Sequence, residues 1–178
     1  MKKYRSFLLT ALFVFFISFV AGLIQANCNP LVIDKVFSEL SPIVEAISSI
    51  DGWKLGLLIF LNNSIKVFGS MILGTFLGIF PLLALIVNGY LIGVIASVSE
   101  INVFLAGILP HGIFEIPSFI LGAAIGLFLG RVALKERSNL RVEISSALVV
   151  FLKIIIPLLF IAAIIEVYLT PKILSIVM

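Results

Sequence analysis

The sequence predicts an all-α polytopic membrane protein with five transmembrane helices and one amphipathic surface segment. Of its 178 residues, 62% are apolar and only 12% are charged. The mean hydropathy of +1.31 is too high for a soluble domain of this size. Several apolar runs also reach the ~20 residues that one bilayer crossing needs. Residues 1–178 therefore form a single integral membrane domain, with little chain left for a separate soluble unit.

The first predicted crossing covers residues 6–26. It follows a basic start (Lys2, Lys3 and Arg5), which also resembles the beginning of a signal peptide. No small-x-small cleavage site follows the apolar run, so we expect a retained membrane helix. The single cysteine, Cys28, excludes an intrachain disulfide and a cysteine-built zinc site.

Residues 30–51 form the predicted amphipathic segment. Asn29 and Pro30 are typical of a helix start, and apolar residues then recur at helical spacing opposite acidic ones. The segment is too polar to span, so we expect it along the membrane surface or against the other helices. Ser41 and Pro42 interrupt the pattern and predict that a second short helix begins there.

Four further crossings are expected at 53–79, 81–98, 101–131 and 144–170. The first two share a nearly continuous apolar run, which Pro81 divides. We expect the helix over 101–131 to be broken between Pro110 and Pro117, because both prolines remove backbone donors. The residues of this predicted break are Pro110, Gly112 and Pro117.

The placement of basic residues predicts the topology. Seven of the twelve lysines and arginines lie before residue 6 or between residues 131 and 141. With five crossings these two clusters face the same side, which the positive-inside rule assigns to the cytoplasm. We therefore expect a multi-pass protein of the cell membrane with its N-terminus in the cytoplasm and its C-terminus outside.

Small residues recur at spacings of four in the predicted spans. Such ladders let helix backbones approach closely, as in glycine-zipper packing. We expect these positions to form helix–helix contacts or a dimer seam, and hence a homo-oligomer. The residues are Gly74, Gly78, Gly89, Gly93, Gly122, Gly126 and Gly130.

A set of polar residues lies at similar predicted depth. Counting 1.5 Å per residue puts Lys66 at ~20 Å and Glu115 at ~21 Å along their helices. His111 and Glu115 share one helix face, as do Asn62 and Lys66. Glu166 and Lys153 are expected to reach water at opposite ends of the last span. The predicted intramembrane cluster is Asn62, Asn63, Lys66, Asn88, His111 and Glu115.

Three interpretations of this cluster remain open. It could be a polar network that fixes helix register, with an ion pair between Lys66 and Glu115. It could be a transport or conduction site, since transporters use discontinuous helices with polar residues at mid-depth. His111 and Glu115 could also bind a metal, but one chain supplies too few ligands for zinc, so we expect no metal. A closed network would favour the first interpretation and a water-filled path the second.

The sequence resembles the stage II sporulation protein M family, an integral membrane protein family of bacteria and archaea. The resemblance covers roughly residues 53–170 and rests on Leu61-Asn62-Asn63, on Asn88-Gly89-x-x-x-Gly93 and above all on the block from Pro110 to Pro117. It implies a multi-pass membrane protein. In spore formers, members of the family anchor a peptidoglycan-remodelling complex.

The residues and the resemblance together favour a membrane scaffold or anchor for partner proteins. The alternative is a small transporter or channel with its site around His111 and Glu115; a metal site is the third possibility. We expect contacts with membrane lipids and with membrane or cell-envelope proteins. No nucleophile–base pair, phosphate loop or nucleic-acid surface is recognisable, so we expect neither enzymatic activity, nor a cofactor, nor a nucleic-acid partner.

Overall fold

The computed structural model describes residues 2–177, apart from the side chains of Lys2, Ile43, Val44, Ile47, Ser48 and Arg137. The described chain is helical throughout, and it contains five helical stretches long and apolar enough to cross a membrane, as the sequence predicts. They are α1 (Arg5–Cys28), α3 (Gly52–Leu73), α4 (Ile79–Val98), α5 (Ile101–Lys135) and a last span over Leu140–Val177.

The last span consists of α6 (Leu140–Val150), α7 (Ile156–Ile164) and α8 (Thr170–Val177), joined by two π-helical turns. The turns cover Phe151–Ile155 and Ile165–Leu169, and each ends two residues before a proline, Pro157 or Pro171. A π-helical turn widens the helix where a proline lacks its N–H donor. Helix therefore continues past Pro171 instead of ending at residue 170 as expected.

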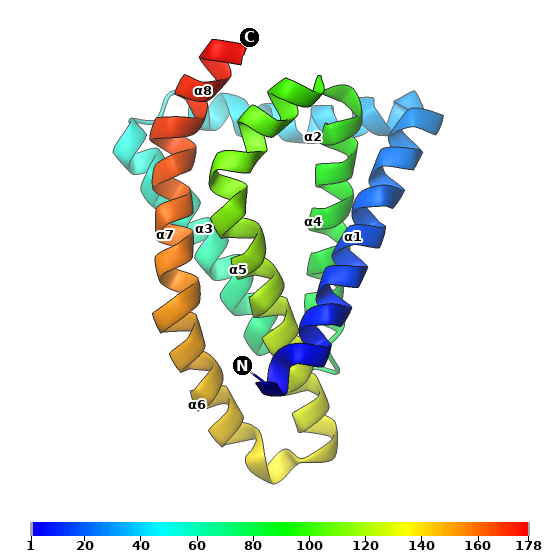
Figure 1. Ribbon diagram of the computed structural model, residues 1–178, viewed down its shortest axis with the longest axis vertical. Coiled ribbons are helices and arrows are strands. Elements are labelled where there is room, and N and C mark those ends of the chain that lie inside the picture. The colour runs from blue at the N-terminus through cyan, green and yellow to red at the C-terminus, as the bar shows by residue number, and fades with distance from the viewer. Residues whose placement is uncertain (1, 178) are drawn as a thin grey trace.

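Helix α5 is the centre of the molecule. In its most apolar stretch, 67% of the residues are buried, against 17–28% in the corresponding stretches of the other four spans. It packs on α1, α3, α4 and α7, and Figure 1 shows it running between α3 and α7 on one side and α1 and α4 on the other. Its buried Ile125 and Leu129 meet Met71 of α3 and Ile155 and Leu159 of the last span.

Pro42 was expected to mark the start of a second short helix, but it lies inside a continuous one. Helix α2 (Pro30–Ser48) continues through Pro42, so no second short helix begins there. Its apolar side, including Val36, packs on Ala26 of α1 and Val94 of α4. In Figure 1, α2 lies across one end of the spans, as expected of an amphipathic surface segment.

The turn between α3 and α4 lies earlier than expected. Helix α3 ends at Leu73 instead of residue 79, and α4 begins at Ile79. Gly78 adopts the left-handed conformation with φ of 72°, which glycine tolerates without a steric cost, so it ends the turn. Pro81 is accepted in the first turn of α4, where its missing N–H costs nothing.

Several of the predicted small residues lie where two helix backbones nearly touch. A Cβ atom at Gly126 would lie 2.6 Å from the Ser70 carbonyl oxygen, and one at Gly74 would lie 2.3 Å from that of Gly126. On the other side, Gly89 and Gly93 of α4 meet the α1 backbone at Phe15 and Phe19. Gly122 and Gly130 make comparably close approaches to α3 and to the turn that follows it. These glycines serve contacts within the chain, so they lend no support to the expected homo-oligomer, which remains a prediction.

Candidate functional site

His111 and Glu115 lie in a continuous part of α5. The helix runs without interruption from Ile101 to Lys135 with Pro110 and Pro117 inside it, so the predicted break is wrong. Each proline still removes one backbone donor, so the carbonyls four residues earlier, those of Ala106 and Ile113, lose their α-helical N–H partner. Surrounding helices and side chains make such prolines tolerable in membrane helices.

Gly112 lies between the two ionisable residues and is buried. A Cβ atom there would meet side-chain atoms of Ile108 and Ile116 on the same helix, at 3.3 and 3.4 Å. Its backbone is helical, so it marks no break in α5.

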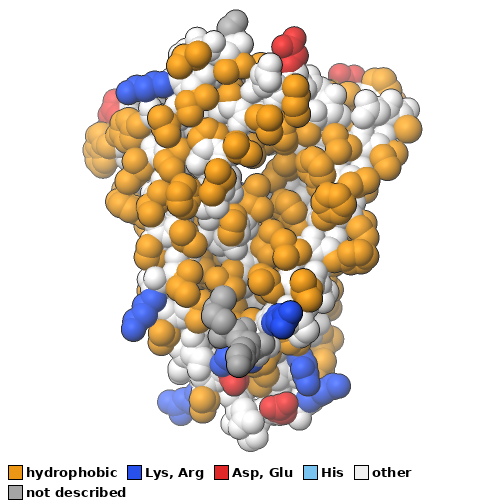
Figure 2. Space-filling view, in the orientation of Figure 1, with side chains coloured by type: hydrophobic (Ala, Val, Ile, Leu, Met, Phe, Trp, Pro, Cys, Tyr) orange, Lys and Arg blue, Asp and Glu red, His pale blue; other side chains and the backbone are white. Residues whose placement is uncertain are grey.

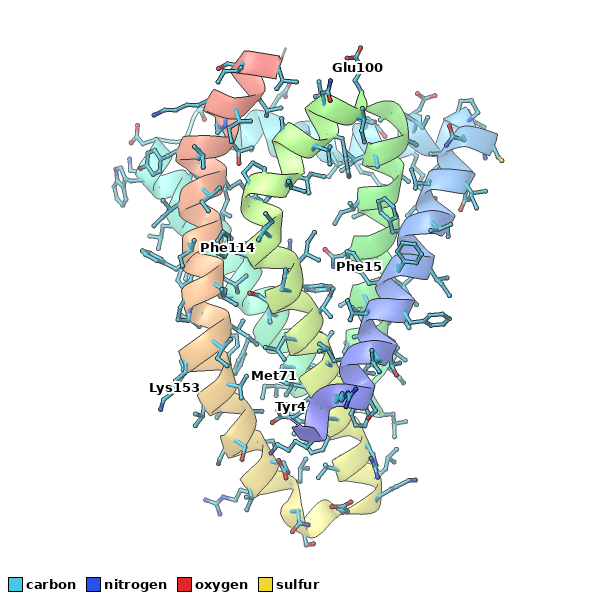
Figure 3. The ribbon with its side chains drawn as sticks, in the orientation of Figure 1. Tyr4, Phe15, Met71, Glu100, Phe114 and Lys153 are labelled. Carbon is cyan, nitrogen blue, oxygen red and sulfur yellow. The ribbon has the colours of Figure 1, made fainter. Side chains whose placement is uncertain are left out.

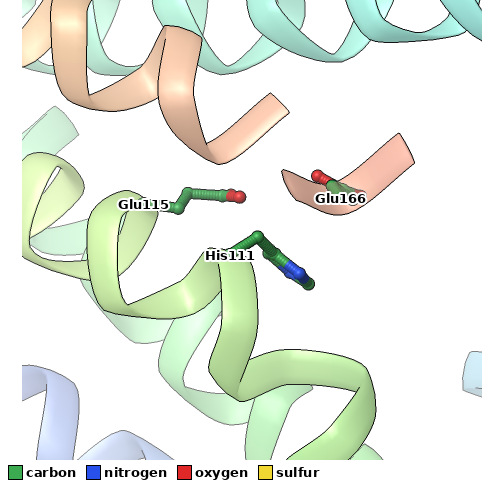
Figure 4. A group of neighbouring side chains, drawn as sticks. All are labelled: His111, Glu115 and Glu166. Atoms are coloured by element: carbon green, nitrogen blue, oxygen red, sulfur yellow. The ribbon is translucent and has the colours of Figure 1, made fainter. Parts of the chain in front are cut away.

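Glu166 of the last span completes a group with His111 and Glu115. One ligand atom from each of the three side chains lies within 4.8 Å of the others, and all three side chains are half-buried. Figure 4 shows the carboxylates of Glu115 and Glu166 facing one another, with the His111 ring beside them. The sequence suggested that Glu166 simply reaches water, so this neighbourhood corrects that expectation.

Thr170 lies one turn beyond Glu166 and is buried. Its Oγ1 lies 3.3 Å from Nδ1 of His111, within hydrogen-bonding distance. His111 and Glu115 of α5 thus face Glu166 and Thr170 of the last span, and the residues of each pair are four positions apart. The spacing of Glu166 and Thr170 is visible in the sequence, but the rotation that turns them toward His111 depends on packing.

Three other predicted residues gather beside Glu115. Asn63, Lys66 and Asn88 line a cavity of about 40 Å³ together with Glu115, enough for about one water molecule. The Asn63 amide and the Lys66 ammonium both lie close enough to stabilise the charge of the Glu115 carboxylate. Lys66 also lies close enough to attract Glu166. Asn88 donates instead to the Ala84 carbonyl of its own helix, at 2.8 Å.

Asn62 lies apart from this group. Its side chain is exposed on the surface of α3 and does not line the cavity. Lys66 is also exposed, although it lines the cavity. Four of the six predicted polar residues therefore line one cavity, but the six do not form a single closed network.

A groove of about 430 Å³ opens beside Lys66, between α3 and α4. Figure 1 shows the two helices diverging from the turn that joins them. The floor of the groove contains Lys66, Gly69, Ser70, Ala84 and Asn88; its walls are large apolar side chains, namely Ile65, Leu73, Phe80, Leu83, Val87 and Phe119.

The charged residues outside the spans gather as the sequence predicts. The N-terminus and the link between α5 and α6 lie at the same end of the molecule, where Figure 2 shows most of the lysines and arginines. Lys3 forms an ion pair with Glu143 at this end. Burial by itself lowers the pKa of Lys3, but the hydrogen bond to Glu143 and nearby groups outweigh it, and the pKa rises.

Lys153 contributes nothing to the site. Its side chain is exposed, and Figure 3 shows it pointing away from the other helices, whereas Tyr4 and Met71 lie within them. Figure 3 also places Glu100 at the turn between α4 and α5, at the end of the molecule opposite Tyr4.

Known proteins match almost the whole chain. The sequence pattern of the family described as stage II sporulation protein M matches residues 6–171. An uncharacterised protein of Methanocaldococcus jannaschii is 34% identical, over 93% of this chain and 94% of the relative. No solved structure matches. The extent of the match confirms the resemblance drawn from the block around His111 and Glu115: this chain belongs to the stage II sporulation protein M family.

Proposed function

We propose that this multi-span protein is a membrane scaffold that anchors partner proteins, and that a transmembrane helix of the partner docks in the groove between α3 and α4. One observation carries the proposal. The groove places a lysine and several small residues at membrane depth, on a face where other spans of this chain leave open space.

The floor of the groove has the composition of a helix–helix contact. Gly69, Ser70 and Ala84 are small residues, which allow a second helix to approach closely. Nothing lies within 4 Å of a Cβ atom built on Gly69, whereas Gly74 and Gly126 are in backbone contact. A docked helix would fill the open space beside Gly69.

The charge of the groove indicates the chemistry of the partner. An ammonium group exposed toward lipid at this depth is costly, by about 2.5–3.5 kcal/mol on insertion scales. A carboxylate on the partner helix would offset part of that cost at Lys66. A symmetric pairing of two copies through this groove would bring two Lys66 side chains together. The predicted homo-oligomer would therefore use another face.

The scaffold proposal includes the expected orientation. We propose a location in the cell membrane with the end that carries Lys3 and Arg131 in the cytoplasm, because this end holds most of the basic residues. The opposite end, with α2 and Glu100, would then face outward, toward cell-envelope partners of the kind that family members bind in spore formers. We propose no enzymatic activity.

Site-specific photo-crosslinking in cells that make this protein tests the proposal. A photoreactive residue at Leu83, which lines the groove and is 53% exposed, should form a discrete adduct with another membrane or envelope protein. Phe13 is the matched control, because it is 65% exposed in a wholly uncharged depression between α1 and α4. Equal adducts from both positions, or only lipid adducts from Leu83, would contradict docking. An adduct with a second copy alone would contradict the choice of partner.

Ion transport is the second candidate, and the polar cavity beside Glu115 favours it. A cavity for about one water molecule, lined by Lys66 and Glu115, resembles one step of an ion pathway at membrane depth. Liposome flux measured with wild type and Glu115→Gln tests this function. A flux that Glu115→Gln abolishes would support transport, and indistinguishable fluxes across ions and pH values would exclude it.

A further inference from the structure

His111, Glu115 and Glu166 have the geometry of a metal site. Their ligand atoms come from two helices and already lie within 4.8 Å of one another. A tetrahedral zinc ion, bound at about 2.0–2.2 Å, holds its ligand atoms about 3.3–3.6 Å apart. Rotation about side-chain bonds can close a difference of this size, because the three side chains are only half-buried. The backbone need not move.

We propose that these three side chains bind one divalent transition-metal ion, with Zn²⁺ as the best match. This inference goes beyond the scaffold function and does not depend on the α3–α4 groove. One imidazole nitrogen and two carboxylate oxygens suit zinc and its neighbours in the first transition row. Calcium prefers six to eight oxygen ligands, and the site offers too few of them.

Charge balance within the membrane is the second argument. The two carboxylates face each other, and Lys66 is the lysine that attracts both of them. With both carboxylates ionised and a neutral imidazole, one negative charge would remain without a counter-charge at a depth where charges are costly. A bound cation would supply the missing positive charge. A protonated His111 would be the alternative source, and it would exclude the metal.

Thr170 has the position of a residue that orients a metal-binding histidine. Its Oγ1 lies 3.3 Å from Nδ1 of His111. If Nδ1 donates its proton to Thr170, the tautomer is fixed and the lone pair of Nε2 is left for the metal. Metal-binding histidines commonly use their other nitrogen in this way.

The local helix geometry brings the ligands together. Glu166 lies in the π-helical turn Ile165–Leu169, and such turns are frequent at functional sites. His111 and Glu115 lie one turn apart on α5, so both project toward the last span.

Metal binding by the full-length chain in nanodiscs tests the proposal. The protein is stripped with chelator, dialysed against Zn²⁺ alone, and analysed for metal per chain and for affinity by competition with a chromophoric chelator. We expect one Zn²⁺ per chain and a loss of affinity of at least tenfold in Glu166→Gln. Glu100→Gln is the control, because Glu100 is exposed at the α4–α5 turn and lies outside the site.

Two further variants separate binding from folding. Lys66→Met removes a like charge beside the cation and should raise Zn²⁺ affinity roughly fivefold or more. Thr170→Val keeps the shape but loses the hydroxyl, so it should lower affinity about tenfold. A gain in Lys66→Met cannot come from misfolding.

Co²⁺ provides a spectroscopic check of the ligand set. A tetrahedral site should give visible absorption bands with Co²⁺ in wild type and Glu100→Gln, and these bands should be absent in His111→Ala. Absence of stoichiometric Zn²⁺ in the wild type would overturn the proposal and favour the protonated His111 network. Unchanged affinity in Glu166→Gln would also overturn it, because the metal would then bind elsewhere.

Discussion

Helix α3 has two faces that meet their neighbours in different ways. On one face, Ser70 and Gly74 touch the backbone of α5 and Met71 is fully buried. On the other face, Lys66 and Gly69 line the open groove toward α4. Both faces contain small residues, so composition alone does not distinguish them. A small residue in a membrane helix therefore indicates a helix–helix contact only where a second backbone lies against it.

The largest expected effect comes from a substitution where α3 packs against α5. Gly126→Ala places a methyl group 2.6 Å from the Ser70 carbonyl oxygen, so α3 and α5 must move apart. Overpacking of this kind costs about 1–3 kcal/mol, so the thermal unfolding temperature in detergent should fall by several degrees.

Gly69→Ala is the matched control for this substitution. Nothing lies within 4 Å of the added methyl group, and alanine favours helix over glycine by up to about 1 kcal/mol. The unfolding temperature should therefore stay the same or rise. Equal losses in Gly69→Ala and Gly126→Ala would show that the two faces of α3 do not differ.

A smaller effect is expected from two adjacent asparagines. Asn63 lines the cavity beside Glu115 and stabilises its carboxylate, whereas Asn62 is exposed and has no side-chain hydrogen bond within the described chain. Asn63→Leu should cost about 0.6 kcal/mol and at most about 1.7 kcal/mol, the average and the maximum for polar contacts between membrane helices. Asn62→Leu should be neutral or stabilising for the isolated protein. Unfolding in mixed detergent would compare them, and the reverse order would count against the assigned contacts.

The smallest effect is expected at the ion pair that joins the ends of the first and last spans. Lys3→Met removes a partly exposed partner of Glu143 and should cost about 0.2–1 kcal/mol, less at high salt. The folded chain raises the pKa of Lys3 above its ordinary value of 10.5. The contribution is therefore complete below pH 10.5 and is lost as the pH rises through the folded value.

Thermal unfolding of wild type and Lys3→Met across pH measures this contribution. The difference in unfolding temperature should be constant from about pH 7 to pH 9 and shrink above about pH 11. Lys54→Met is the control, because the Lys54–Asp51 pair is more exposed and spans only three residues. A difference that grows with alkaline pH would contradict the assignment to Lys3.

The number and type of spans follow from the sequence because hydropathy and length determine them. Helix ends and proline positions are less predictable. Pro110 and Pro117 are strong breakers in water, yet α5 continues through them, because packed neighbours and the lack of competing water make helix the best available conformation. Helix α2 also continues through Pro42, which lies on its exposed side. The end of α3 at Leu73 depends on the left-handed Gly78, and a glycine's φ cannot be read from the sequence.

Depth counting also placed Lys66 and Glu115 near one level, where the structure has them lining one cavity. Depth counting could not show that Asn62 is exposed whereas Asn63 lines the cavity, and it did not place Glu166 beside Glu115. Depth depends on position along the chain, which the sequence contains. Which way a side chain points depends on the rotation of each helix, and packing against other helices determines that rotation.

The central claim, that the α3–α4 groove is a docking surface, is tested most directly by filling it. Gly69→Leu adds a side chain to the open floor of the groove, which has room for it, so the unfolding temperature should match that of Gly69→Ala. The photo-adduct from Leu83 should disappear in Gly69→Leu and persist in Gly69→Ala. An adduct of undiminished yield in Gly69→Leu would contradict the claim.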